Sequence, residues 1–167
     1  MRSALAEIHR PLDQAGLIPD SAAGRQALFF FGTLMDLDIL AYVLERPIDL
    51  DDLQPAMLHG HRRVAIAGVT YPTLVRTPRS RVRGRLLRRA TRRDIARINH
   101  LESGEYRAEL HPVRTGDAAE HAAWLYMGLE HMPATARPWS LRQWQRRHKA
   151  GYFAACDGWM ADFQPID

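Results

Sequence analysis

The sequence predicts an α+β domain built on a mixed, mostly antiparallel sheet. Its predicted strands gather in the early and middle parts of the chain and do not alternate regularly with helices, as the strands of a doubly wound parallel fold would. Two of them, residues 106–113 and 122–127, flank a Thr-Gly-Asp triplet that favours an antiparallel hairpin. The chain then continues into an amphipathic helix, expected at about residues 140–163.

Length and composition are those of one globular domain. The 167 residues are enough to bury a core, and the apolar share of 46% and the charged share of 25% are ordinary. No apolar run is long enough to span a membrane, and charged residues interrupt the start of the chain where a secretory signal would need an apolar stretch. Cys156 is the only cysteine, so no intramolecular disulfide can form, and we expect a cytoplasmic protein.

The first strand and the turn after it are the elements around which the rest is arranged. Residues 1–26 contain proline and glycine at short intervals, which indicates an N-terminal extension before a domain over residues 27–167. Three consecutive phenylalanines predict the centre of a buried strand over residues 27–31. Gly32 then ends the strand, and the apolar spacing that follows predicts a helix over residues 36–44.

Two more strands and a second helix follow. Residues 57–66 and 81–87 are predicted strands, the second with an alternating, half-buried pattern, and Gly60 indicates a bulge or a point of close approach in the first of them. A Thr-x-x-Asp capping box at residues 91–94 predicts the start of the helix. Its last apolar residue directly precedes Glu102, so this glutamate is expected at the end of the helix.

The turn after the first strand is a candidate anion-binding site. A strand that ends in glycine shortly before a helix leaves several backbone N–H groups close together. Residues 31–36 have this arrangement, so they can receive a carboxylate or another anion. A purely structural strand-turn-helix connection is the alternative interpretation.

Familiar nucleotide, nucleophile and zinc signatures are absent from the sequence. Cys156 falls on the apolar face of the last helix, which indicates a core residue rather than a nucleophile. His59 and His61 flank Gly60 and could point the same way, but no third ligand is nearby and no metal site is expected. Ten arginines over residues 76–97 would suit phosphate contacts, but no aromatic residues are interleaved for base stacking, so this pattern does not predict nucleic-acid binding.

Two short motifs, in their order and spacing, give a family resemblance. Phe31-Gly32-Thr33-Leu34 matches a Tyr-Gly-Thr-Leu signature with Phe in place of Tyr. Residues 98–107 match a Leu-Asp-x-x-Glu-Gly signature followed by Tyr and Arg, with Asn99 and Ser103 as substitutions. Over about residues 27–130 the chain resembles the γ-glutamylcyclotransferase-like family, which includes plant avirulence-induced-gene-like proteins and bacterial relatives.

The resemblance implies a fold, a reaction and a set of site residues. The fold is a mostly antiparallel sheet curled into a small barrel-like core, with flanking helices and a long C-terminal helix. The reaction is the cyclisation of a γ-glutamyl amine or peptide to 5-oxoproline, with Glu102 as general acid/base and with no cofactor or metal. The substrate-binding positions that the motifs carry over are Phe31, Gly32, Thr33, Leu34, Tyr106 and Tyr126.

The expected partner is a small γ-glutamyl substrate, with neither membrane nor nucleic acid involved, and a homodimer is left open. Two other functions stay open. A binding module could hold a small amino-acid-like ligand on the same fold without turnover, and an arginine-rich nucleic-acid-binding protein is the weakest of the three. Only the enzyme needs Glu102 and the glycine turn to open into one cavity, so their relative position discriminates between these functions.

Overall fold

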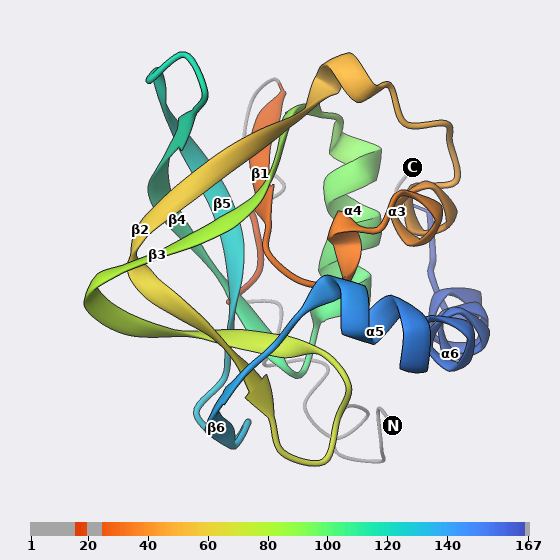
Figure 1. Cartoon of the computed structure of the whole chain (residues 1–167). Helices are drawn as coiled ribbons and strands as arrows, with labels where there is room; N and C mark the ends of the chain where they lie inside the picture. The colour runs from red at the N-terminus through yellow and green to blue at the C-terminus, as the bar shows by residue number, and fades with distance from the viewer. Residues whose placement is uncertain (1–15, 20–24, 166–167) are drawn as a thin grey trace.

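Five strands close into a barrel, and the helices pack against one side of it (Figure 1). The computed structural model describes residues 16–19 and 25–165. Around the barrel the strand order is β3-β1-β5-β4-β2; β2 pairs with β3 to close the ring, and β6 pairs with β2 outside it. The strands are β1 (Gln26–Phe30), β2 (Leu53–Ile66), β3 (Pro72–Ala90), β4 (Tyr106–Thr115), β5 (Glu120–Gly128) and β6 (Ala134–Pro138).

Helices and short 3-10 turns connect and cover these strands. In chain order they are η2 (Thr33–Met35), α3 (Leu37–Leu44), η3 (Leu50–Asp52), α4 (Arg92–Glu102), α5 (Leu141–Arg147) and α6 (Lys149–Ala161). Within the described residues, no helix is both long and apolar enough to cross a membrane.

The strand pairings confirm the predicted sheet. β1 and β5 are parallel, with Leu28 opposite Trp124, whereas the other pairings among the described strands are antiparallel. The predicted hairpin is β4–β5, in which Leu110 lies opposite Trp124. The α+β class, with a mixed and mostly antiparallel sheet curled into a barrel-like core, is therefore confirmed.

A bulge bends the long β2–β3 hairpin. Gly60 has a φ of 79°, in the left-handed region that favours glycine. The register slips at this residue, because His59 lies opposite Arg81 whereas His61 lies opposite Arg76. The bulge predicted at Gly60 is confirmed, and it helps the hairpin to curl around the barrel.

Both strands of this hairpin are longer than the sequence predicts. β2 begins at Leu53 rather than at residue 57, and β3 begins at Pro72 rather than at residue 81. The first part of β3, before residue 81, was not predicted because it contains prolines, and a residue without a backbone N–H argues against a strand. Pro78 is tolerated because it lies in the unpaired stretch between Arg76 and Arg81, opposite the bulge.

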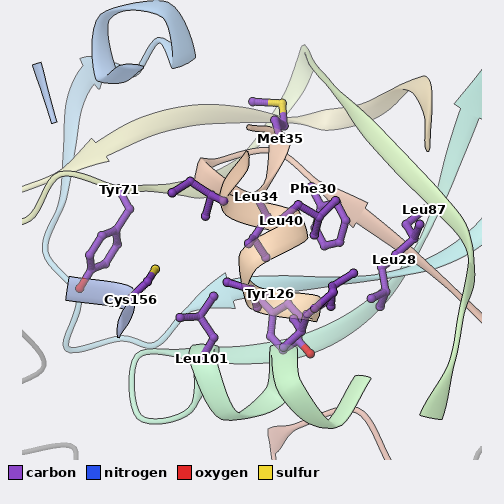
Figure 2. Close-up of a cluster of buried hydrophobic side chains, with 14 of the residues drawn as sticks. Leu28, Phe30, Leu34, Met35, Leu40, Tyr71, Leu87, Leu101, Tyr126 and Cys156 are labelled. Atoms are coloured by element: carbon purple, nitrogen blue, oxygen red, sulfur yellow. The ribbon is translucent and has the colours of Figure 1, made fainter. Parts of the chain in front are cut away.

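Strand β1 contributes to two apolar clusters. Its side chains alternate, so Phe29 packs in the cluster inside the barrel, together with Phe31 just beyond the strand. Leu28 and Phe30 pack on the other face, where Figure 2 shows them with Leu40 of α3. The strand therefore ends on the boundary between the barrel and its helical cover.

The prediction of one C-terminal helix at residues 140–163 is wrong in one respect, because this segment consists of two helices, α5 and α6. They meet at His148, whose φ of −129° and ψ of −16° are not helical, and their axes diverge in Figure 1. Apolar residues keep a three- or four-residue spacing across the break, so the periodicity cannot reveal it. Different anchors hold the two sides: Trp144 is buried in the core, whereas Lys149 forms ion pairs at the start of α3.

Most of the predicted N-terminal extension, residues 1–26, lies outside the described residues, so the domain boundary at residue 27 stays a prediction. Within residues 16–19, Ile18 is buried against the core. Its N–H donates to Oδ1 of Asn99 at 3.1 Å, and its carbonyl accepts from Nδ2 at 3.0 Å. An aspartate carboxylate could not make both bonds, so Asn99 is suited to hold this segment on α4.

Asp94 connects α4 to the end of α3. Its carboxylate is 1% exposed and accepts hydrogen bonds from Nε and Nη2 of Arg46, at 2.9 and 2.8 Å. The Thr91 N–H also donates to it at 2.9 Å, which completes the predicted capping box. Burial alone would raise the pKa of Asp94, but the bonds from Arg46 and Thr91 outweigh it and hold the pKa below its ordinary value.

Asp94→Asn is expected to lower the free energy of unfolding by about 2–3 kcal/mol at neutral pH, because it leaves a partly buried guanidinium without its carboxylate. The folded-state pKa is depressed, so this stabilisation is fully present above the unfolded pKa of about 3.9 and is lost as pH falls through the folded value. Urea unfolding at neutral and at strongly acidic pH measures both effects, and the difference from wild type should shrink in acid. Asp51→Asn, at an exposed aspartate, is the control. An equal loss of unfolding free energy in that variant would contradict the role given to the Asp94–Arg46 pair.

Candidate active site

A cavity opens where β1 ends, between the barrel and the C-terminal helices. Its volume is about 530 Å³, including the part that is open to solvent. The residues assigned to the site from the sequence all lie in its wall: Phe31, Gly32, Thr33, Leu34, Glu102, Tyr106 and Tyr126. The glycine turn and Glu102, which are far apart in the chain, therefore share one cavity.

Backbone geometry and one arginine hold the turn after β1. The Gly32 carbonyl accepts the N–H of Met35 at 3.0 Å, while the N–H groups at the start of such a turn have no acceptor within it. Nη1 of Arg63 donates to the Phe31 carbonyl at 3.0 Å. Because this peptide is trans, the Gly32 N–H points away from Arg63. A Cβ on Gly32 would lie 3.0 Å from the ring of Pro72, so glycine allows this close approach.

Asp36 anchors the other end of the turn. It is 3% exposed, and Oδ1 caps α3 by accepting the N–H groups of Asp38 and Ile39 at 3.0 and 3.1 Å. Oδ2 accepts from Gln145 and from Lys149, both at 2.9 Å. Burial opposes ionisation, but these bonds outweigh it and lower the pKa of Asp36. One buried carboxylate thus joins the turn to the C-terminal helices.

Three aromatic side chains form part of the cavity wall, and we refer to Tyr71, Tyr152 and Trp159 as the aromatic wall. The ring centroids of Tyr71 and Tyr152 are 6.2 Å apart, and those of Tyr152 and Trp159 are 5.2 Å apart. Oγ1 of the buried Thr33 donates to the Tyr152 hydroxyl at 3.2 Å. Helix α6 is therefore bonded directly to the turn.

Glu102 is the last residue of α4. The helix ends there because Ser103 leaves the helical conformation and Gly104 has a φ of 86°. Burial raises the pKa of Tyr106 and of Tyr126 well above the ordinary 10.0, and the nearby negative charge of Glu102 raises both further. The half-buried carboxylate thus lies close to two neutral phenols in the wall of the cavity.

A second carboxylate, which the sequence analysis did not assign, lies in the same wall. Glu105 accepts a hydrogen bond from the Tyr71 hydroxyl through Oε2 at 2.7 Å. Glu105 is thus hydrogen-bonded to the aromatic wall, and its charge also raises the pKa of Tyr106, although less than the charge of Glu102 does. Its place within the matched motif, three residues after Glu102, was the signal that could have identified it.

The hydroxyls of both expected tyrosines are bound by the protein itself. Tyr106 donates to the Pro72 carbonyl at 2.8 Å, and Tyr126 donates to Oδ1 of Asn99 at 2.6 Å. The ring of Phe31 packs in the cluster inside the barrel. These three side chains shape the wall, and the two hydroxyls hold the elements around it in place.

Tyr71, Tyr152 and Trp159 were missed as site residues. Tyr71 stands in a short segment before a proline, which carries no site pattern. Tyr152 and Trp159 lie on the apolar face of the final helix, and such a face predicts core packing. They do pack on the core, with Tyr152 only 8% exposed, and they line the cavity as well. For Tyr152, a hydroxyl-bearing ring in an otherwise apolar stripe was the available signal.

Among the described residues, no three His, Cys, Asp or Glu side chains are placed to hold a metal ion. His59 and His61 do not share a side as the sequence suggested, because the Gly60 bulge lies between them and leaves His59 exposed and His61 buried. The ring of His61 instead packs against that of His111, with centroids 5.1 Å apart. Cys156 is fully buried in the core, as predicted.

Comparisons with known protein sequences agree with one another. The family model described as gamma-glutamyl cyclotransferase, AIG2-like, matches residues 28–146. AIG2-like protein A of Arabidopsis thaliana is 27% identical over 124 residues, which cover 73% of each chain. Protein AIG2 C of the same plant is 23% identical over 123 residues, which cover 72% of this chain and 73% of the relative.

Solved structures share the fold. A solution structure of an Arabidopsis thaliana protein has a TM-score of 0.60 at 21% identity and covers 90% of this chain and 100% of that one. A structure of a protein named gamma-glutamyl cyclotransferase has a TM-score of 0.52 at 13% identity and covers 85% and 89%. The family match ends at residue 146, so Tyr152 and Trp159 of the aromatic wall lie beyond the matched residues.

Proposed function

The chain belongs to the gamma-glutamyl cyclotransferase, AIG2-like family, and we propose that it cyclises a γ-glutamyl amine or peptide to 5-oxoproline with release of the amine. The observation that carries the proposal is the shared cavity, because Glu102 and the turn at residues 31–34 both line it. A proton carrier and a group that holds the substrate in the attacking geometry are the two parts that this reaction needs.

The nucleophile of this reaction belongs to the substrate. The α-nitrogen attacks the carbonyl carbon of the γ-glutamyl amide, and the new C–N bond closes a five-membered ring. The C–N bond to the leaving amine then breaks. An α-ammonium group loses two protons on the way and the leaving nitrogen gains two, so no net proton is consumed. The protein therefore has to fold the substrate back on itself and carry protons between its two nitrogens.

Glu102 is the proposed carrier of these protons. As a carboxylate it accepts a proton from the α-ammonium, and as a carboxylic acid it returns a proton to the leaving nitrogen. The raised pKa of Tyr106 and of Tyr126 keeps both phenols neutral, so they do not compete with Glu102 as bases. Their buried rings supply an apolar surface beside the reacting atoms.

The turn at residues 31–34 is the proposed site for the α-carboxylate of the substrate. Its backbone N–H groups are donors of the kind that bind anions. Arg63 supports this role, because its bond to the Phe31 carbonyl directs the Gly32 N–H to the opposite side of the peptide. Glu105 is proposed to hold Tyr71 in the aromatic wall rather than to transfer protons.

A panel of γ-glutamyl compounds tests the proposed function. The purified protein is incubated with compounds such as γ-glutamylalanine and γ-glutamylethylamine, and 5-oxoproline is measured by chromatography and mass spectrometry. We expect release from at least one compound, in proportion to the protein concentration. Calorimetric binding of a compound without release would indicate a non-catalytic binding module. The absence of both binding and release across the whole panel would contradict the proposal.

A further inference from the structure

A second hollow lies next to the cavity, on the far side of the aromatic wall. Tyr71, Tyr152 and Trp159 line both spaces, so the hollow adjoins the cavity at these side chains. Residues 68–70 also line the hollow, together with Arg147 and His148 at the junction of α5 and α6. We refer to residues 68–70, Arg147 and His148 as the basic groove. These residues also line an adjoining hollow.

The cavity and the basic groove differ in charge. Glu102 and Glu105 line the cavity, whereas Arg147 and His148 line the groove, and the adjoining hollow adds Arg137 of β6. Among the described residues, no carboxylate lines the groove. Arg147 is exposed and forms no ion pair with any described residue. A cation in this setting is available to an anionic group of a ligand.

The groove is held in a defined position relative to the cavity. Nζ of Lys149, two residues after Arg147, lies 2.9 Å from the buried carboxylate of Asp36 at the end of the glycine turn. Tyr152 is bonded to Thr33 of the same turn. The α5–α6 junction is therefore attached to the element that is proposed to bind the α-carboxylate of the substrate.

We propose that the basic groove receives the leaving half of the substrate and selects amines that carry a carboxylate. This inference rests on the proposed function. With the γ-glutamyl half in the cavity, the leaving amine has to extend into a neighbouring space, and the groove shares three side chains with the cavity. Arg147 supplies the cation that would pair with the carboxylate of a leaving amino acid. The substrate class is then γ-glutamyl amino acids and peptides with a free terminal carboxylate, rather than γ-glutamyl derivatives of plain amines.

The cationic side of the groove lies just beyond the family match, whereas residues 68–70 on the same groove lie within it. The matched residues stop at 146, and Arg147 and His148 follow directly. The residues proposed to select the amine thus lie just outside the matched part, whereas Glu102 and the turn at residues 31–34 lie within it.

Two substrates that differ only in the carboxylate test the groove. γ-Glutamylalanine and γ-glutamylethylamine present the same amide, and we expect wild type to favour the first about fivefold in kcat/KM, the effect of one solvent-accessible ion pair at its upper range. Arg147→Ala should reduce this preference to about one- to twofold, mainly through KM. Arg146→Ala removes the same charge from the adjacent exposed position, which lines neither hollow, and should keep the preference. A wild-type preference near one, or an equal loss in both arginine variants, would overturn the inference.

A binding measurement separates failure of the groove from failure of the proposed function. γ-Glutamylalanine is titrated calorimetrically into wild type, Arg147→Ala and Arg146→Ala. Binding that is weaker by about fivefold in Arg147→Ala alone supports the groove even if 5-oxoproline is not released, in which case only the proposed function fails. Equal affinity in all three proteins, or no binding to any of them, overturns the groove.

Discussion

Glu102→Gln is expected to lower kcat for 5-oxoproline release by about 10³-fold, within the range of about 10²–10⁴ that general acid–base catalysis contributes. Glutamine keeps the shape of the side chain but can neither accept nor return a proton. KM should change little, because the proton transfers occur in the reaction and not in substrate binding. Release of 5-oxoproline at saturating substrate measures the loss, and circular dichroism with thermal unfolding confirms that the variant is folded.

Glu105→Gln is the matched control for this prediction. It makes the same change in the same cavity wall, and the glutamine oxygen can still accept the hydrogen bond from Tyr71. We expect kcat to fall by less than about tenfold, since only the charge next to the aromatic wall is lost. If Glu105→Gln abolished release while Glu102→Gln kept most of it, the two glutamates would have to exchange roles.

The sequence predicts the site well where each part is a local pattern. The end of β1 is marked by glycine before a capped helix, and the end of α4 by its last apolar residue and by Gly104, so the positions of Gly32 and Glu102 at element ends follow from their neighbours. The sheet class follows from the order of the strands. No local pattern shows that the two ends meet in one cavity; the family resemblance implied it, and the structure shows it.

Features that depend on a distant partner could not be predicted. Strand β6 pairs with β2 only at Val64–Pro138 and Ile66–Ala134, and its mostly exposed residues have no buried face to mark it. The break at His148 leaves the apolar spacing intact, and the ion pairs of Lys149 that follow it join residues far apart in the chain. The site role of the aromatic wall was missed for the same reason, since packing alone already accounts for its residues.

The arginines show this limit most clearly. As composition they indicate a solvated basic surface or a phosphate site. Several instead bind backbone carbonyls: Arg93 donates to Leu44 at 3.1 Å, and Arg97 donates to Val43, at the end of α3 where helix carbonyls lack partners. A backbone carbonyl has no side-chain signature, so the sequence cannot show which arginine it will bind.

Arg63 is the arginine on which the candidate site depends most. Nη1 donates to the carbonyls of Phe31 and Arg83, both at 3.0 Å, and Nε donates to that of Trp139 at 3.3 Å. The guanidinium also lies 5.6 Å from the centroid of the Trp139 ring. Burial lowers the pKa of Arg63, but an arginine remains charged at physiological pH. One side chain therefore joins the end of β1, strand β3 and the segment that leads into α5.

Arg63→Met is expected to lower the free energy of unfolding by about 2–4 kcal/mol, because it leaves carbonyls without their donor at a cost of about 1–3 kcal/mol for each one that is buried. It should also lower kcat/KM by about 10–100-fold, since the freed peptide before Gly32 can rotate its N–H out of line with the substrate. Urea unfolding measures the first effect, and kinetics below the unfolding transition measure the second. Arg62→Met, at the exposed neighbouring residue, should change neither. If Arg63→Met were destabilised but kept the wild-type kcat/KM when folded, Arg63 would support the barrel alone, and the turn would hold its geometry through Asp36 and Thr33.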